Sequence, residues 1–174
     1  NAGIALMELR RFDEALKAFG EAIGLDPDFP LFQINKAILF TRWGRLDDAL
    51  KAYGEALKPD DRYAAIYAYR ADTLWRFKRY PEALASVDTA LDLGKNYPFA
   101  YAVKARILQR LERHDEALRF VDQALQLDGQ NIHALSTRAL LLTAVGRFDQ
   151  ALRAYEQMTF VQPSEPQGYS GKAF

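Results

Sequence analysis

A period of 34 residues runs through the chain and constrains its fold more than any other feature of the sequence. The dipeptide Ala-Leu recurs five times with this spacing, and its alanines are Ala15, Ala49, Ala83, Ala117 and Ala151. A second series of small residues has the same spacing and consists of Gly3, Ala37, Ala71, Ala105, Ala139 and Ala173. Periods of about 20–50 residues are typical of proteins built from stacked repeats. The sequence therefore predicts a repeat array that extends over the whole chain.

Each repeat is interpreted as two helices joined by a short turn. With Pro30 as the first position of a repeat, apolar residues follow at helical spacing at Phe40, Trp43 and Leu46. Most second helices open with an aspartate, which is expected to cap the helix and to suit its dipole; these residues are Asp13, Asp47, Asp115 and Asp149. Pro81 takes this place in one repeat, where proline is tolerated. The pattern predicts an all-α chain without strands.

The small residues are expected to let neighbouring helices cross closely. Within each repeat they stand at the 8th and 20th positions, and a larger side chain there would overpack the contact at a cost of about 1–3 kcal/mol. A third series faces the next repeat and consists of Ala22, Ala56, Ala90 and Ala124. Met158 interrupts this series, so the last junction is expected to be looser.

Composition and charge exclude several classes of function. The chain has 23 basic and 23 acidic residues, and this balance argues against a general binder of nucleic acids or anionic membranes. Without cysteine there is no disulfide, thiol nucleophile or thiolate zinc site. No apolar run approaches the ~18 residues of a membrane span, and no signal peptide is visible. The absence of cysteine and of a signal peptide favours a cytoplasmic location. The start at Asn1, without Met, indicates a fragment of a longer protein.

No motif in the sequence predicts catalysis, a metal site or a cofactor. Neither an HExxH motif, nor an EF-hand loop, nor GxGxxG is present. Of the two histidines, His114 stands where other repeats have an apolar residue, which favours a packing role. The segment 168–172 (GYSGK) fits neither the phosphate-loop spacing nor the GxSxG spacing. We therefore expect no enzyme activity from this chain.

The chain resembles the tetratricopeptide repeat (TPR) family. One repeat carries the signature at Tyr67, Ala71, Leu74, Ala83, Val87 and Ala90, and the first repeat carries it at Gly3, Leu6, Ala15, Phe19, Ala22 and Pro27. The resemblance implies an α-solenoid of antiparallel helix pairs wound into a right-handed superhelix. It also implies a single array with a partial repeat at 1–29, full repeats at 30–63, 64–97, 98–131 and 132–165, and the start of a sixth at 166–174.

By the same resemblance, a partner peptide is expected in a concave groove lined by the first helix of each repeat. The candidate groove residues are Asn35, Ile38, Arg42, Tyr69, Asp72, Trp75, Arg76, Phe99, Arg106, Gln109 and Arg110. Three of the arginines repeat at one position, and exposed aromatic residues are expected beside them, a composition typical of binding hot spots. This predicts an acidic peptide with an apolar anchor. In the alternative interpretation the arginines are solvated and pair with Asp72 or Glu8.

Several functional alternatives stay open at this point. The groove lacks the basic and amide residues of the chaperone-binding carboxylate clamp, since Ile34 and Ile38 stand at two of its positions. A scaffold for a protein or peptide partner is favoured over self-assembly into a homo-oligomer through the terminal half-repeats. A regulatory or targeting arm of a larger enzyme is the third possibility. No nucleic-acid, membrane or cofactor partner is expected.

The arginines at 11, 45, 79, 113 and 147 are interpreted as solvated turn residues.

Overall fold

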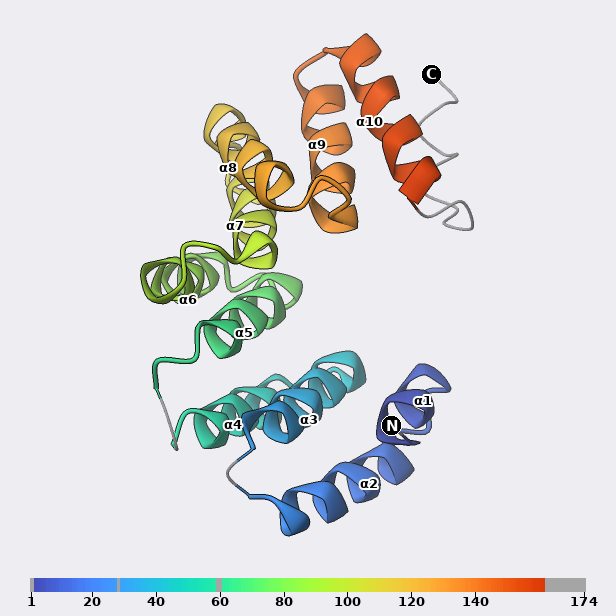
Figure 1. Ribbon diagram of the computed structural model, residues 1–174, viewed down its shortest axis with the longest axis vertical. Coiled ribbons are helices and arrows are strands. Elements are labelled where there is room, and N and C mark those ends of the chain that lie inside the picture. Colours follow the sequence, from blue (N-terminus) through green and yellow to red (C-terminus); the bar gives the residue numbers. More distant parts are fainter. Residues whose placement is uncertain (1, 28, 59–60, 162–174) are drawn as a thin grey trace. The chain divides into compact units, whose positions relative to one another are not determined.

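The computed structural model describes residues 2–27, 29–58 and 61–161, and all regular secondary structure in these residues is α-helical (Figure 1). The helices are α1 (Ala2–Glu8), α2 (Phe12–Leu25), α3 (Pro30–Trp43), α4 (Leu46–Ala56), α5 (Ala64–Arg76), α6 (Tyr80–Leu93), α7 (Pro98–Arg110), α8 (His114–Leu127), α9 (Ile132–Ala144) and α10 (Phe148–Val161). The predicted all-α fold is confirmed. The expected sixth repeat at 166–174, and the segment 168–172 within it, lie outside the described residues.

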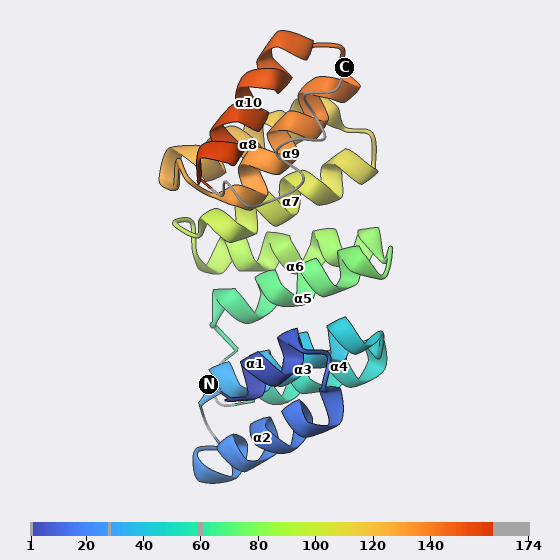
Figure 2. The ribbon, with the colours of Figure 1, turned by 90° about the vertical axis from the view of Figure 1, so that its right-hand side faces the viewer.

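The chain forms two compact units, residues 1–93 and 94–174. In the first unit α1 pairs with α2, α3 with α4, and α5 with α6, while α2 packs on α3 and α4 on α5. In the second unit α7 pairs with α8 and α9 with α10, and α9 also packs on both α7 and α8. Figure 2 shows α5 and α6 running side by side as such a pair. The predicted helix–turn–helix organisation is confirmed within each unit.

The periodic small residues lie where paired helices cross. Side chains of the Ala15 series are at most 3% exposed, and Ala37, Ala71, Ala105 and Ala139 are fully buried. A Cβ atom added at Gly3 would lie 2.7 Å from the ring of Phe19, so only glycine fits there without a shift. Met158 is also buried, among Leu135, Leu142 and other residues of the second unit. The junction that Met158 was expected to loosen involves residues outside the described part of the chain.

The turns between paired helices share one backbone geometry. Each has a residue with positive φ at the same repeat position, and these residues are Arg10, Gly44, Lys78, Glu112 and Gly146. In every such turn the next N–H donates to the carbonyl five residues earlier; the Arg45 N–H, for example, donates to Phe40 at 2.8 Å. This is the Schellman pattern, which satisfies a carbonyl left open at the helix end. The backbone conformation thus repeats with the sequence.

The prediction that aspartates cap the second helices is wrong for Asp13, Asp47 and Asp115. The N-cap residues of α2, α4 and α8 are arginines, and their side chains make no capping hydrogen bond. Each helix begins one residue before the aspartate, because the preceding turn already fixes the arginine backbone. The aspartates therefore lie in the first helical turn, where their charge still suits the positive end of the dipole.

The turn arginines pair with an acid three residues later. Arg11, Arg45, Arg79 and Arg113 donate through Nε to Glu14, Asp48, Glu82 and Glu116 at 2.5–2.7 Å. These hydrogen bonds lower the pKa of the Glu14 and Glu116 carboxyls. The arginines are exposed, as expected for solvated turn residues, but their pairing was not predicted from the sequence. In the fifth turn the corresponding position holds the uncharged Gln150.

Two glycines provide a test of this turn geometry. Gly44 has a φ of 84°, whereas Gly54 lies inside α4, and a Cβ atom at either position meets nothing within 4 Å. Gly44→Ala is expected to lower the free energy of unfolding by about 1 kcal/mol, because L residues disfavour the left-handed region. Gly54→Ala is expected to raise it by about 0.5–1 kcal/mol, because alanine favours helix. Urea unfolding measures both values, and shifts of equal sign would contradict the assigned turn.

Candidate functional site

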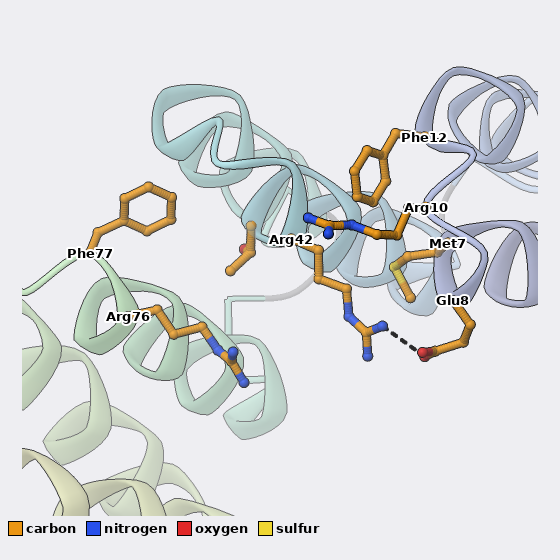
Figure 3. A pocket seen from close by; sticks show the side chains of 8 residues that line it. Met7, Glu8, Arg10, Phe12, Arg42, Arg76 and Phe77 are labelled. Atoms are coloured by element: carbon orange, nitrogen blue, oxygen red, sulfur yellow. Dashed lines mark ion pairs between the residues drawn. The ribbon is translucent and has the colours of Figure 1, made fainter.

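A pocket of about 490 Å³ opens in the first unit, at the C-terminal ends of α1, α3 and α5 (Figure 3). Its lining consists of Met7, Glu8, Arg10, Phe12, Thr41, Arg42, Arg76 and Phe77. Three guanidinium groups therefore share the pocket with one carboxylate, a hydroxyl and three apolar side chains. The last turns of α3 and α5 hold Arg42 and Arg76, where the negative end of each helix dipole favours a cation.

Two ion pairs organise the charged side of the pocket. The Arg42 Nη1 atom lies 2.8 Å from Glu8 Oε1, and the Arg76 Nε atom lies 2.8 Å from Asp72 Oδ2. In Figure 3 the side chains of Arg42 and Arg76 extend from α3 and α5, and the dashed line joins Arg42 to Glu8. The expected alternative, in which Glu8 and Asp72 pair with the arginines, is therefore present in the structure. Exposed pairs of this kind typically contribute about 0–1 kcal/mol to stability.

Aromatic stacking holds the apolar side in place. The ring of Phe12 stacks on Trp43 with 5.6 Å between ring centroids, and Trp43 stacks in turn on Phe40 at 6.4 Å. The Arg45 guanidinium lies 4.9 Å from the centroids of both Trp43 and Phe40. Met7 is buried with the adjoining core of α2 and α3. A stacked, packed wall of this kind loses little side-chain entropy when a ligand binds to it.

A chain of hydrogen-bonded hydroxyl groups joins the lining residue Thr41 to the neighbouring helices. The Thr41 Oγ1 atom donates to the Ala37 carbonyl at 2.8 Å and lies 2.9 Å from Thr73 Oγ1. Thr73 Oγ1 lies 3.0 Å from the Tyr53 hydroxyl, which belongs to α4. Burial raises the pKa of Tyr53, so the phenol keeps its proton. These hydroxyl hydrogen bonds link α3, α4 and α5 next to the pocket that Thr41 lines.

The predicted groove residues of the first unit do not all reach this pocket. Arg42 and Arg76 line it, and Asp72 reaches it through its bond to Arg76. Ile38 and Tyr69 instead pack against the core of α3, α4 and α5, and both side chains are half-buried. Asn35 and Trp75 are half-buried and do not line the pocket.

The remaining candidates lie in the second unit, all on α7. Phe99 is half-buried and packs edge-on against His133, with ring centroids 5.8 Å apart. Arg106 and Gln109 are half-buried, and Arg110 is exposed in the last turn of α7. Of the predicted arginine series, Arg42 and Arg76 line one pocket of the first unit, and Arg110 belongs to the second unit.

Six lining residues were not among the candidate groove residues: Met7, Glu8, Arg10, Phe12, Thr41 and Phe77. Arg10 occupies the positive-φ position of its turn, where the other repeats have glycine, lysine or glutamate, so the sequence carries no signal for it. Phe12 and Phe77 follow the apolar spacing of the helices, which is typical of core residues. Both are only half-buried, and their remaining surface contributes to the pocket.

Other kinds of site find no support in the part of the chain that the structure describes. Among residues 2–27, 29–58 and 61–161, no three His, Asp or Glu side chains are grouped so as to hold a metal ion. Within the same residues, no helix is long and apolar enough to cross a membrane. His114 begins α8 and is half-buried, in keeping with a packing role.

Comparison with known proteins finds one family along the chain. The sequence profile described as tetratricopeptide repeat matches residues 1–65 and 36–101, and that of the N-terminal TPR repeats region of psidin matches residues 74–171. No curated protein matches the sequence.

Several solved structures have the same fold at low sequence identity. The thermophilic TPR protein TTC0263 of Thermus thermophilus is 22% identical, with a TM-score of 0.87 over 99% of this chain and 96% of that one. Yeast Tom70 is also 22% identical, with a TM-score of 0.82 over 98% of this chain and 37% of that one. YrrB, described as a TPR protein with an unusual peptide-binding site, is 16% identical, with a TM-score of 0.66 over 99% and 89% of the two chains.

Proposed function

Because the chain belongs to the tetratricopeptide repeat family, we propose that it is a non-catalytic scaffold that binds an acidic peptide segment of a partner protein at the pocket of the first unit. The fold supports a protein-interaction role in general, and one solved relative of the same fold is described as having a peptide-binding site. The proposal retains a single array with the repeat limits given above.

The composition of the pocket supports an acidic ligand with an apolar anchor. Arg10, Arg42 and Arg76 outnumber the single lining carboxylate of Glu8, so the pocket lining carries a net positive charge. Guanidinium groups bind carboxylates through charge-assisted and often bidentate hydrogen bonds. The adjoining wall of Phe12 and Phe77 offers apolar surface to a neighbouring ligand side chain. This juxtaposition of cations and apolar surface is the observation that carries the proposal.

A peptide-display selection tests this assignment. We expect the wild-type chain to enrich peptides with an acidic residue near an apolar one, and their binding to weaken with added salt. The double variant Arg42→Glu/Arg76→Glu is expected to weaken their binding at least tenfold, because it replaces attraction with repulsion at both positions. Affinities of the enriched peptides are measured by fluorescence anisotropy.

The matched control is Arg113→Glu/Arg147→Glu. It changes the net charge by the same amount but alters turn residues of the second unit, which do not line the pocket. Equal loss of binding in both double variants would indicate a general charge effect and contradict the assigned site. Binding that survives the pocket variant would move the site elsewhere. With no enriched peptide at all, self-assembly becomes the better proposal, and a mass that increases with protein concentration would support it.

A further inference from the structure

We infer that the Glu8 carboxylate occupies the place of an acidic side chain of the ligand, so that Glu8 and the bound peptide compete for Arg42. This inference rests on the proposed function and adds to it a carboxylate subsite and the group that fills it in the free protein. The subsite consists of Arg42 with the neighbouring lining residue Arg10. Its ligand is the carboxylate of an aspartate or glutamate in the partner.

The repeat pattern itself places Glu8 in the arginine series. Glu8, Arg42 and Arg76 are 34 residues apart in turn, and each stands at the C-terminal end of the first helix of its repeat. The first member of the series is thus an acid, and its Oε1 atom lies 2.8 Å from Nη1 of the second member. The pocket therefore already holds a carboxylate, that of Glu8, beside Arg42.

The Glu8–Arg42 pair differs from the ion pairs that other arginines of the first unit make within one helix or turn. Arg11, Arg45, Arg76 and Arg79 pair with acids three or four residues away on the same helix or turn. Glu8 comes from α1 and Arg42 from α3, so their pair spans the pocket between two helix pairs. A ligand that enters the pocket between these helices therefore meets this pair.

The position of Glu8 also makes its carboxylate easy to displace. Glu8 is the last residue of α1, where the negative end of the helix dipole disfavours an acid. The Glu8 side chain is 59% exposed and that of Arg42 is 43% exposed, so water screens their attraction. A peptide carboxylate that brings further contacts with Phe12 and Phe77 can therefore replace Glu8 at Arg42.

The substitution Glu8→Gln tests the competition in the full chain. It keeps the size of the side chain but removes the competing charge, and we expect the enriched peptides to bind about three- to fivefold more tightly. The matched control is Glu14→Gln, which removes an acid from the Arg11–Glu14 pair outside the pocket lining and is expected to leave their affinity unchanged. Fluorescence anisotropy at low and high salt measures both, and added salt should reduce the gain.

A second measurement needs no peptide. Succinate serves as a simple dicarboxylate probe, and the Nε–Hε signal of Arg42 is followed by NMR during its addition. In the Glu8→Gln variant this signal should respond at a several-fold lower succinate concentration than in the wild-type chain. An equal response in the two proteins would overturn the inference.

The two proposals fail in different ways. If Glu8→Gln leaves peptide affinity unchanged or weakens it while Arg42→Glu/Arg76→Glu abolishes binding, the pocket binds peptides but Glu8 does not compete, and the inference is wrong. If no peptide binds either protein, the proposed peptide function is wrong. Succinate binding then decides alone whether Glu8 fills a carboxylate subsite.

Discussion

Leu74→Ala is expected to lower the free energy of unfolding by about 2–5 kcal/mol. Leu74 is fully buried in α5, and its carbonyl also accepts the Schellman hydrogen bond from the Arg79 N–H. The substitution removes buried methyl groups and leaves a cavity that packed helices close only in part. Urea unfolding followed by tryptophan fluorescence measures the change, because both tryptophans, Trp43 and Trp75, belong to the first unit.

The control for this substitution is Leu140→Ala. Leu140 is 50% exposed on α9, so its truncation should change stability by no more than about 0.5 kcal/mol. Circular dichroism should accompany the fluorescence, because repeat proteins need not unfold in a single step. Similar losses for the two leucines would mean that burial at Leu74 is not what stabilises the first unit.

Ala71→Leu is expected to cost about 1–3 kcal/mol by the opposite mechanism. Ala71 in α5 and Ala83 in α6 are both fully buried in the same helix pair, so additional methyl groups at Ala71 must displace neighbouring atoms. The same urea experiment measures the effect. Ala144→Leu makes the identical change at an exposed position at the end of α9, and it should be close to neutral. A neutral Ala71→Leu would contradict the close crossing inferred from the small-residue series.

The fold was predictable because the residues that determine it recur every 34 positions along the sequence. Two of the predicted full repeats begin with a proline, at 30 and 98, and α3 and α7 begin at these residues. The capping prediction failed because the position of a helix start depends on the backbone of the preceding turn. That turn needs a residue with positive φ, and only Gly44 and Gly146 mark it in the sequence, whereas Arg10 does not.

The site was predictable only where it follows the same period. Arg42 and Arg76 share a repeat position and line one pocket, as the spacing suggests. Arg10 lies in a turn, off the helix face from which the groove was predicted, so the repeat pattern did not predict its place in the pocket. The partial burial of Tyr69 depends on contacts with residues of neighbouring helices, which the spacing within one helix does not specify.

The hydrogen bonds that join Tyr53, Thr73 and Thr41 all run in one direction. That direction determines which kind of ligand group Thr41 can bind. Thr41 has one hydroxyl hydrogen and donates it to the Ala37 carbonyl, so Thr73 must donate to Thr41 and Tyr53 to Thr73. Thr41 therefore has no hydrogen left to donate and can only accept a further hydrogen bond, whereas the guanidinium groups that line the same pocket can only donate. A ligand that bonds to Thr41 as well as to the arginines therefore needs both polarities: a carboxylate for the guanidinium groups and an N–H or O–H group for Thr41. A segment that presents acceptors alone would satisfy the arginines and leave the threonine oxygen without a partner from the ligand.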